Sequence, residues 1–127
     1  MEKMTRNELK ILVTDDSALT RKQITDMLSE LGCTNIIEAK NGLDAIEKFK
    51  VEKPNVCFLD IIMPECDGID ATKAIMEIDD TTHVVICSTV GTQAKLKEAI
   101  NAGAREFIQK PARRDQLDFV LSKIAED

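Results

Sequence analysis

The chain has 127 residues, a length typical of one compact domain. Apolar residues make up 43% of it and charged residues 31%, a composition that excludes an intrinsically disordered protein. The net charge is −6 and the only aromatic residues are four phenylalanines, which disfavours direct binding to nucleic acid or to an anionic membrane.

Short runs rich in β-branched residues alternate with longer segments in which apolar residues recur at helical spacing. The runs predict five strands, at Lys10–Thr14, Asn35–Ala39, Val56–Asp60, His83–Ser88 and Glu106–Gln109. A helix is predicted after each strand, and Gly32, Pro54 and Gly103 mark the ends of three of them.

This alternation predicts an α/β fold in which right-handed βαβ crossovers build a parallel sheet with helices on both faces. In a doubly wound sheet of this kind, the ligand site lies beyond the carboxyl ends of the strands. The residues that directly follow the strands are therefore the candidate functional residues.

The four cysteines contain no C-x-x-C pair, and two of them, Cys57 and Cys87, lie inside apolar runs. We expect buried thiols in a reducing compartment rather than catalytic or metal-binding cysteines. His83 is the only histidine and is expected at a strand start. Because one histidine is not enough, the usual set of nitrogen and sulfur ligands for zinc is missing. No apolar run approaches the roughly 20 residues that cross a bilayer, and we expect a cytoplasmic protein.

Polar side chains gather at the predicted strand ends. Asp15 and Asp16 follow the first strand, Asp60 ends the third, Ser88 ends the fourth and Lys110 follows the fifth. Each position has an ordinary alternative interpretation. Asp16 or Ser17 could cap a helix, Asp60 could begin a turn, Ser88 and Thr89 could cap another helix, and Lys110 could be solvated. Their coincidence at successive strand ends favours a functional site.

Three carboxylates in one place repel one another unless a cation lies among them. Carboxylate oxygens without nitrogen or sulfur donors suit a hard ion such as Mg²⁺. A metal ion, a lysine ammonium and a hydroxyl together can neutralise and orient a phosphoryl group, and a carboxylate can accept it as a nucleophile. The sequence thus predicts phosphoryl chemistry at an aspartate.

The motifs that carry these residues resemble those of response-regulator receiver domains. They are Asp15-Asp16, the L-D-I-I-M-P-x-x-D-G segment at Leu59–Gly68, Ser88 and Lys110-Pro111, and the resemblance covers about residues 8–125 of a single domain, 1–127. The segment from Cys87 to Pro111 looks most like the chemotaxis-type, single-domain receivers. The resemblance implies a flavodoxin-like (βα)5 fold with strand order 2-1-3-4-5.

By this resemblance, Asp60 accepts a phosphoryl group from a phosphohistidine on a partner kinase. Asp16 and Asp60 bind Mg²⁺ directly, Asp15 acts largely through water, and the main-chain carbonyl of Ile62 is a further ligand. Lys110 pairs with the phosphoryl group.

The resemblance also implies a switch. Ser88 is the hydroxyl drawn toward the phosphoryl group, Pro111 follows a cis peptide bond, and Phe107 matches the switch aromatic residue. An ordinary core phenylalanine is an equally good interpretation of Phe107. Phosphorylation then biases a two-state element that runs from Ser88 to Phe107.

Three departures from the family pattern stand out. Ala112 replaces a common phenylalanine, and Thr89 replaces a common alanine. Ile62 and Val90 occupy the two variable positions beside the phosphoacceptor, and neither side chain can hydrogen-bond an attacking water. We therefore expect slow self-dephosphorylation.

The expected function is a phosphorylation-dependent switch, not a classical enzyme, that binds a downstream protein through the face built by residues 93–127. Alternatives are a phosphorylation-independent pseudo-receiver and a receiver cut from a multidomain regulator. A haloacid-dehalogenase-type phosphatase would need a second aspartate where this chain has Ile62. A flavin-binding domain fits poorly because the carboxylates would repel the flavin phosphate.

Overall fold

Five β-strands alternate with five α-helices in the part of the chain that the structure describes. The structure is a computed structural model that describes residues 4–89 and 91–127. In chain order the elements are β1 (Lys10–Thr14), α1 (Ala18–Glu30), β2 (Asn35–Ala39), α2 (Gly42–Glu52), β3 (Val56–Leu59), α3 (Gly68–Ile78), β4 (His83–Ser88), α4 (Gln93–Ala102), β5 (Glu106–Gln109) and α5 (Arg114–Ile124). All paired strands are parallel, in the order β2-β1-β3-β4-β5, which confirms the predicted fold.

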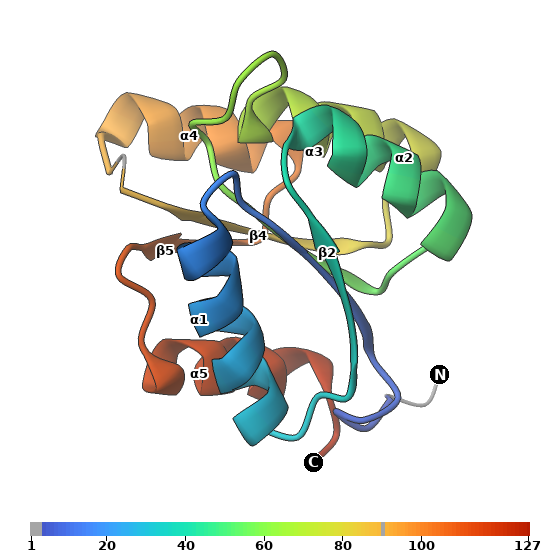
Figure 1. Ribbon diagram of the computed structural model, residues 1–127. Helices are drawn as coiled ribbons and strands as arrows, with labels where there is room; N and C mark the ends of the chain where they lie inside the picture. Colours follow the sequence, from blue (N-terminus) through green and yellow to red (C-terminus); the bar gives the residue numbers. More distant parts are fainter. Residues whose placement is uncertain (1–3, 90) are drawn as a thin grey trace.

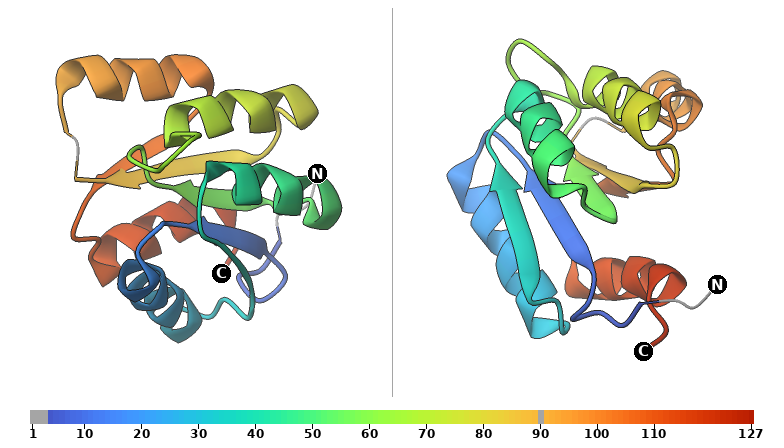
Figure 2. Two further views of the ribbon diagram at one scale, coloured as in Figure 1. Left: turned by 45° about the horizontal axis from the view of Figure 1, so that its top comes forward. Right: turned by 90° about the vertical axis from the view of Figure 1, so that its right-hand side faces the viewer.

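Helices cover both faces of the sheet, as Figures 1 and 2 show. α1 and α5 pack on one face, over an apolar cluster that includes Leu28 and Leu117. α2, α3 and α4 pack on the other face, over a cluster that includes Phe49 and Ile75. These four side chains are fully buried, and burial of each contributes about 1.5–3 kcal/mol to the free energy of unfolding.

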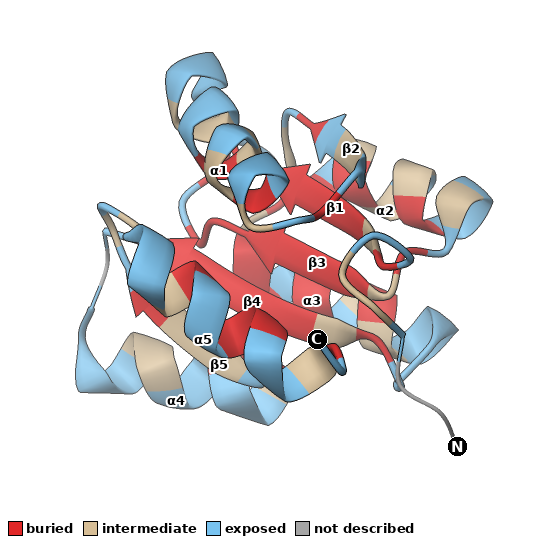
Figure 3. Ribbon diagram, turned by 90° about the horizontal axis from the view of Figure 1, so that it is seen from below, coloured by how far each residue is buried: buried red, intermediate tan, exposed pale blue. Residues whose placement is uncertain are grey.

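The inner strands are buried on both faces, which explains why their sequences do not alternate between apolar and polar residues. All four residues of β3 are buried, whereas β2, at the edge of the sheet, is mostly exposed or half-buried. Figure 3 shows this contrast between the central and edge strands. None of the helices in the described ranges is long and apolar enough to cross a membrane.

Short polar side chains begin most of the helices. The side-chain oxygen of the residue before the helix accepts a hydrogen bond from a main-chain N–H of the first turn. This occurs at Ser17, Asn41, Asp67 and Thr92. The predicted helix ends are confirmed: Gly32 and Gly103 adopt φ values of 103° and 119°, which favour glycine, and α2 ends two residues before Pro54.

One prediction and one alternative interpretation at the strand ends are wrong. β3 ends at Leu59 rather than at Asp60, because the Asp60 carboxylate accepts a hydrogen bond from the N–H of Ile62 at 3.2 Å and so stabilises a turn. Ser88 and Thr89 do not cap the fourth helix, since Thr92 does so.

A close approach fixes the loop that carries Asp60 against the start of α3. Gly68 donates its N–H to the carbonyl of Ile61 at 2.9 Å. A Cβ atom at Gly68 would lie 2.1 Å from the carbonyl oxygen of Asp60, a distance that no packed atoms tolerate. Only glycine therefore allows this loop to pass so near the helix.

We predict that Gly68→Ala lowers the free energy of unfolding by about 1–3 kcal/mol, because the added methyl group pushes the Asp60 loop outward. Urea denaturation measures the change. Gly91→Ala is the matched control, since its Cβ would meet only the end of the flexible Gln109 side chain, at 3.0 Å. Equal losses in the two variants would contradict the prediction.

Candidate functional site

Three loops and the end of β4 bring the predicted site residues together at the carboxyl edge of the sheet. One carboxylate oxygen from each of Asp15, Asp16 and Asp60 lies within 4.8 Å of the others. Asp15 and Asp60 are buried, whereas Asp16 is exposed to solvent. The sheet register explains the convergence: Thr14 pairs with Leu59, so the aspartates that follow them leave the sheet side by side.

The Lys110 ammonium forms ion pairs with two of these carboxylates. It contacts Asp15, and its Nζ lies 2.6 Å from Oδ2 of Asp60. Only 13% of the Lys110 side chain is exposed, so the solvated alternative for this residue is wrong. The N–H of Lys110 also donates to the carbonyl of Ser88 at 2.9 Å, which joins the loop after β5 to the end of β4.

Burial works against the charged form of Lys110. The hydrogen bonds and charges of Asp15 and Asp60 outweigh that effect and raise the pKa of Lys110 above its ordinary value. The ammonium therefore stays charged at neutral pH. The stability that it contributes is lost only as the pH rises through this raised pKa, in the alkaline range.

In each of the two buried carboxylates, one oxygen atom contacts a main-chain N–H and the other contacts Lys110. Oδ1 of Asp15 accepts a hydrogen bond from the N–H of Ser17 at 2.9 Å, and Oδ1 of Asp60 accepts one from Ile62, while the Oδ2 atoms face Lys110. Among the described residues, the carboxylate of Asp16 has no hydrogen-bond or ion-pair partner. Three negative charges thus meet one positive charge, and this all-oxygen donor set suits a hard divalent cation.

The residues predicted to form the switch lie beside this cluster. Ser88 is fully buried at the end of β4, and the Lys110–Pro111 peptide bond is cis, which confirms that expectation. Phe107 is half-buried and packs against the apolar cluster under α2, α3 and α4, as a core residue does.

Of the two variable positions beside Asp60, only Ile62 lies within the described residues. Ile62 projects to the surface with 60% of its area exposed. Val90 lies outside the described residues. Thr89 is exposed and, with Lys110 and Pro111, lines a cavity of about 290 Å³ next to α1.

None of the cysteine thiols in the described ranges belongs to this cluster of charged side chains. All four are buried and none forms a disulfide within the described ranges, which confirms the expected buried thiols. Burial raises the pKa of the Cys87 thiol to about 11, so this group stays protonated at neutral pH.

Sequence reasoning missed one residue at the site. Arg21, on α1, donates a hydrogen bond from Nη1 to the carbonyl oxygen of Asp15 at 2.6 Å. No motif or charge pattern in the sequence alone singles out this arginine among the surface cations of the helix.

Residues 11–121 match the response regulator receiver domain family. The chain is 41% identical to the chemotaxis protein CheY of Thermotoga maritima over 116 residues, which cover 91% of this chain and 97% of that protein. It is also 44% identical to a protein-glutamate methylesterase/protein-glutamine glutaminase of Archaeoglobus fulgidus, over 94% of this chain but only 34% of that protein. Among solved structures, it resembles a chain of the CheX–CheY–BeF3–Mg²⁺ complex from Borrelia burgdorferi, with a TM-score of 0.86, 35% identity, and coverage of 91% of this chain and 88% of that one.

The family match spans most of the chain and agrees with the strand order and the acidic edge described above. The chain therefore belongs to the response regulator receiver domain family of two-component signalling. Within that family it is a receiver domain of the CheY type, since the Thermotoga protein matches it over nearly the full length of both chains.

We predict that Lys110→Met lowers the free energy of unfolding by about 3 kcal/mol at neutral pH without divalent cations, because two buried carboxylates lose their shared counter-ion. Chemical denaturation provides the measurement. The control is Lys22→Met, which removes an exposed lysine paired with Asp26 on the helix surface and should change stability by less than about 0.5 kcal/mol. A Lys110→Met variant as stable as the wild-type protein would show that the ion pairs contribute nothing net.

Proposed function

We propose that the chain is a phosphorylation-dependent signalling switch in which Asp60 accepts a phosphoryl group from a histidine kinase. The observation that carries the proposal is the cluster of Asp15, Asp16 and Asp60 around the ammonium of Lys110. Phosphoryl transfer depends mainly on positioning and on neutralising the charge of the transferred group, and this cluster supplies both.

Mg²⁺ is the proposed cofactor, because it prefers carboxylate oxygens and keeps several waters. The carboxylates of Asp15, Asp16 and Asp60 and the main-chain carbonyl of Ile62 would hold it. When bound, it supplies positive charge that offsets the charge of the phosphoryl oxygens. The related Borrelia complex contains both Mg²⁺ and BeF3, which supports the same assignment here.

Each residue at the edge then has a distinct role in the transfer. A carboxylate oxygen of Asp60 is the nucleophile that attacks phosphorus, and the phosphohistidine nitrogen leaves. Lys110 already contacts Asp60 at 2.6 Å, so its ammonium is placed to pair with a phosphoryl oxygen on that side chain. The Ser88 hydroxyl, at the end of the adjacent strand, donates to another phosphoryl oxygen.

The switch would carry the change from this edge to the face formed by α4, β5 and α5. Ser88, Phe107 and Pro111 are its proposed elements, because Lys110 links the loop after β5 to Ser88 through the main chain. Two large apolar side chains on this face are exposed, Ile100 to 57% and Phe119 to 60%. We propose that a downstream protein binds there, and we propose no direct contact with nucleic acid or membrane.

The broader assignments follow from this function. We propose a non-enzymatic, cytoplasmic protein whose chemistry is limited to its own aspartyl phosphate, with residues 1–127 as one receiver domain and about 8–125 as its core. The chain spans only a third of the Archaeoglobus relative, so the same unit also occurs within longer proteins. The complete acidic cluster disfavours a pseudo-receiver, and Ile62 lies where a haloacid-dehalogenase-type phosphatase needs an aspartate.

We predict that incubation with acetyl phosphate and Mg²⁺ adds the mass of one phosphoryl group to the intact protein. Asp60→Asn should abolish the gain, because the amide is not a nucleophile for phosphorus. Asp70→Asn is the control, since it removes an exposed carboxylate on α3 outside the site. No mass gain in the wild-type protein would favour phosphorylation-independent binding, and a gain in Asp60→Asn would place the acceptor elsewhere.

We predict that the phosphorylated protein loses its phosphoryl group slowly and that Ile62→Asn speeds this loss by about tenfold, the effect of one hydrogen bond worth ~1.4 kcal/mol in the transition state. The amide can orient an attacking water, whereas the exposed isoleucine cannot. Decay of the added mass after removal of acetyl phosphate provides the rate. Ile62→Leu is the control, and a wild-type lifetime of only seconds would contradict the prediction.

A further inference from the structure

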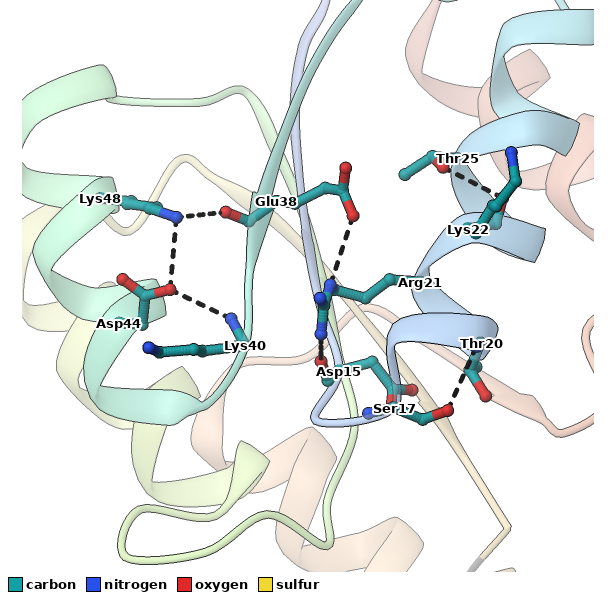
Figure 4. Close-up of polar contacts among 10 residues, drawn as sticks. All are labelled: Asp15, Ser17, Thr20, Arg21, Lys22, Thr25, Glu38, Lys40, Asp44 and Lys48. Atoms are coloured by element: carbon teal, nitrogen blue, oxygen red, sulfur yellow. Dashed lines mark hydrogen bonds and ion pairs between the residues drawn. The ribbon is translucent and has the colours of Figure 1, made fainter.

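Arg21 is joined to the acidic edge from the neighbouring helix. Its Nη1 donates to the carbonyl oxygen of Asp15 at 2.6 Å, and its Nε lies 3.3 Å from Oε1 of Glu38 on β2. Figure 4 shows the guanidinium between these two partners. Only 18% of the Arg21 side chain is exposed, compared with 73% for the next residue, Lys22. Arg21 is thus held in one place, unlike an ordinary surface arginine.

The carbonyl that Arg21 contacts belongs to the peptide that links Asp15 to Asp16. The other groups of Asp15 are also held: its N–H donates to the carbonyl of Ala39 at 3.2 Å, and its carboxylate contacts Ser17 and Lys110. The Arg21 contact completes this set by fixing the plane of the peptide. That plane decides the direction in which Asp16, the exposed carboxylate of the cluster, leaves the chain.

The main chain of Glu38, whose carboxylate contacts the other side of the guanidinium, is itself held in place. Nζ of Lys48 on α2 donates to the main-chain carbonyl of Glu38 at 2.5 Å and lies 3.3 Å from Oδ2 of Asp44. The same Asp44 oxygen accepts a hydrogen bond from the N–H of Lys40 at 3.1 Å. These contacts, all drawn in Figure 4, join the Asp15 loop to β2 and to the start of α2.

We propose that Arg21 is a positioning residue for the cation site: through the Asp15 carbonyl it orients the Asp15–Asp16 peptide so that the Asp16 carboxylate faces the carboxylates of Asp15 and Asp60. This inference rests on the proposed binding of Mg²⁺. A planar guanidinium can contact a carbonyl and a carboxylate at once with fixed geometry, which a lysine ammonium on a flexible stem does not reproduce.

A purely electrostatic role and a positioning role predict opposite results for Mg²⁺ binding. Arg21 carries a positive charge next to the acidic cluster, so its removal would strengthen the binding of a cation if charge alone mattered. If Arg21 positions the ligands, its removal weakens binding in spite of that charge effect. Partners that orient metal ligands typically contribute about 10–100-fold to metal affinity.

The test is a titration of the full chain with MgCl2, followed by amide chemical shifts, on four proteins: the wild type, Arg21→Gln, Arg21→Lys and Lys22→Gln. We expect the Kd for Mg²⁺ to rise about tenfold in Arg21→Gln and to take an intermediate value in Arg21→Lys. Lys22→Gln removes the same charge one residue away and should leave the Kd unchanged or slightly lower. Melting temperatures in the presence of a chelator report the structural contribution of Arg21 separately.

An unchanged or lower Kd in Arg21→Gln would overturn the inference while leaving the proposed function intact. Absence of Mg²⁺ binding in the wild-type protein would instead refute the cofactor on which both rest. If Arg21→Gln does not fold, Glu38→Gln provides the answer, because it weakens the hold on the guanidinium from the exposed edge strand. The matched control is then Glu47→Gln, which removes the same negative charge from the exposed surface of α2. The inference requires a higher Kd in Glu38→Gln than in Glu47→Gln, and equal values would refute it.

Discussion

Repulsion among three carboxylates at one edge of the sheet is the constraint on which the rest of the molecule depends. Lys110 relieves part of it by pairing with Asp15 and Asp60. Main-chain N–H groups of Ser17 and Ile62 hold the remaining oxygens of these two side chains. The net negative charge that remains is the feature on which the proposed binding of a divalent cation rests.

The sheet makes this arrangement possible because parallel strands deliver their carboxyl ends to one place. Pairing of Thr14 with Leu59 sets the two buried aspartates side by side, and pairing of Ser88 with Gln109 brings Lys110 next to the serine. Apolar clusters on both faces hold the strands in this register. A site of charged groups is therefore supported by a core that contains almost none.

Neighbouring helices, as well as the sheet, hold the loops at this edge in place. Gly68 lets the start of α3 approach the carbonyl of Asp60, and Arg21 reaches from α1 to the carbonyl of Asp15. Both contacts act on the main chain rather than on the functional carboxylates. We therefore expect changes at Gly68 and Arg21 to reach the site through the backbone, although neither residue has a role in the proposed chemistry.

The sequence by itself determined the fold and most of the site, because periodic burial and short motifs are local properties. The β-branched runs located all five strands, and Asp15, Asp16, Asp60 and Lys110 were identified because each lies at, or directly after, the end of a predicted strand. Only the tertiary structure decided what depends on contacts between distant segments. In the structure, β3 ends at Leu59 and Thr92 caps α4. Arg21 is the cation of α1 that contacts the carbonyl of Asp15. Arg21 and Lys22 are neighbouring cations in the sequence, and the rotation of α1 against the sheet alone turns one toward the site and the other toward water.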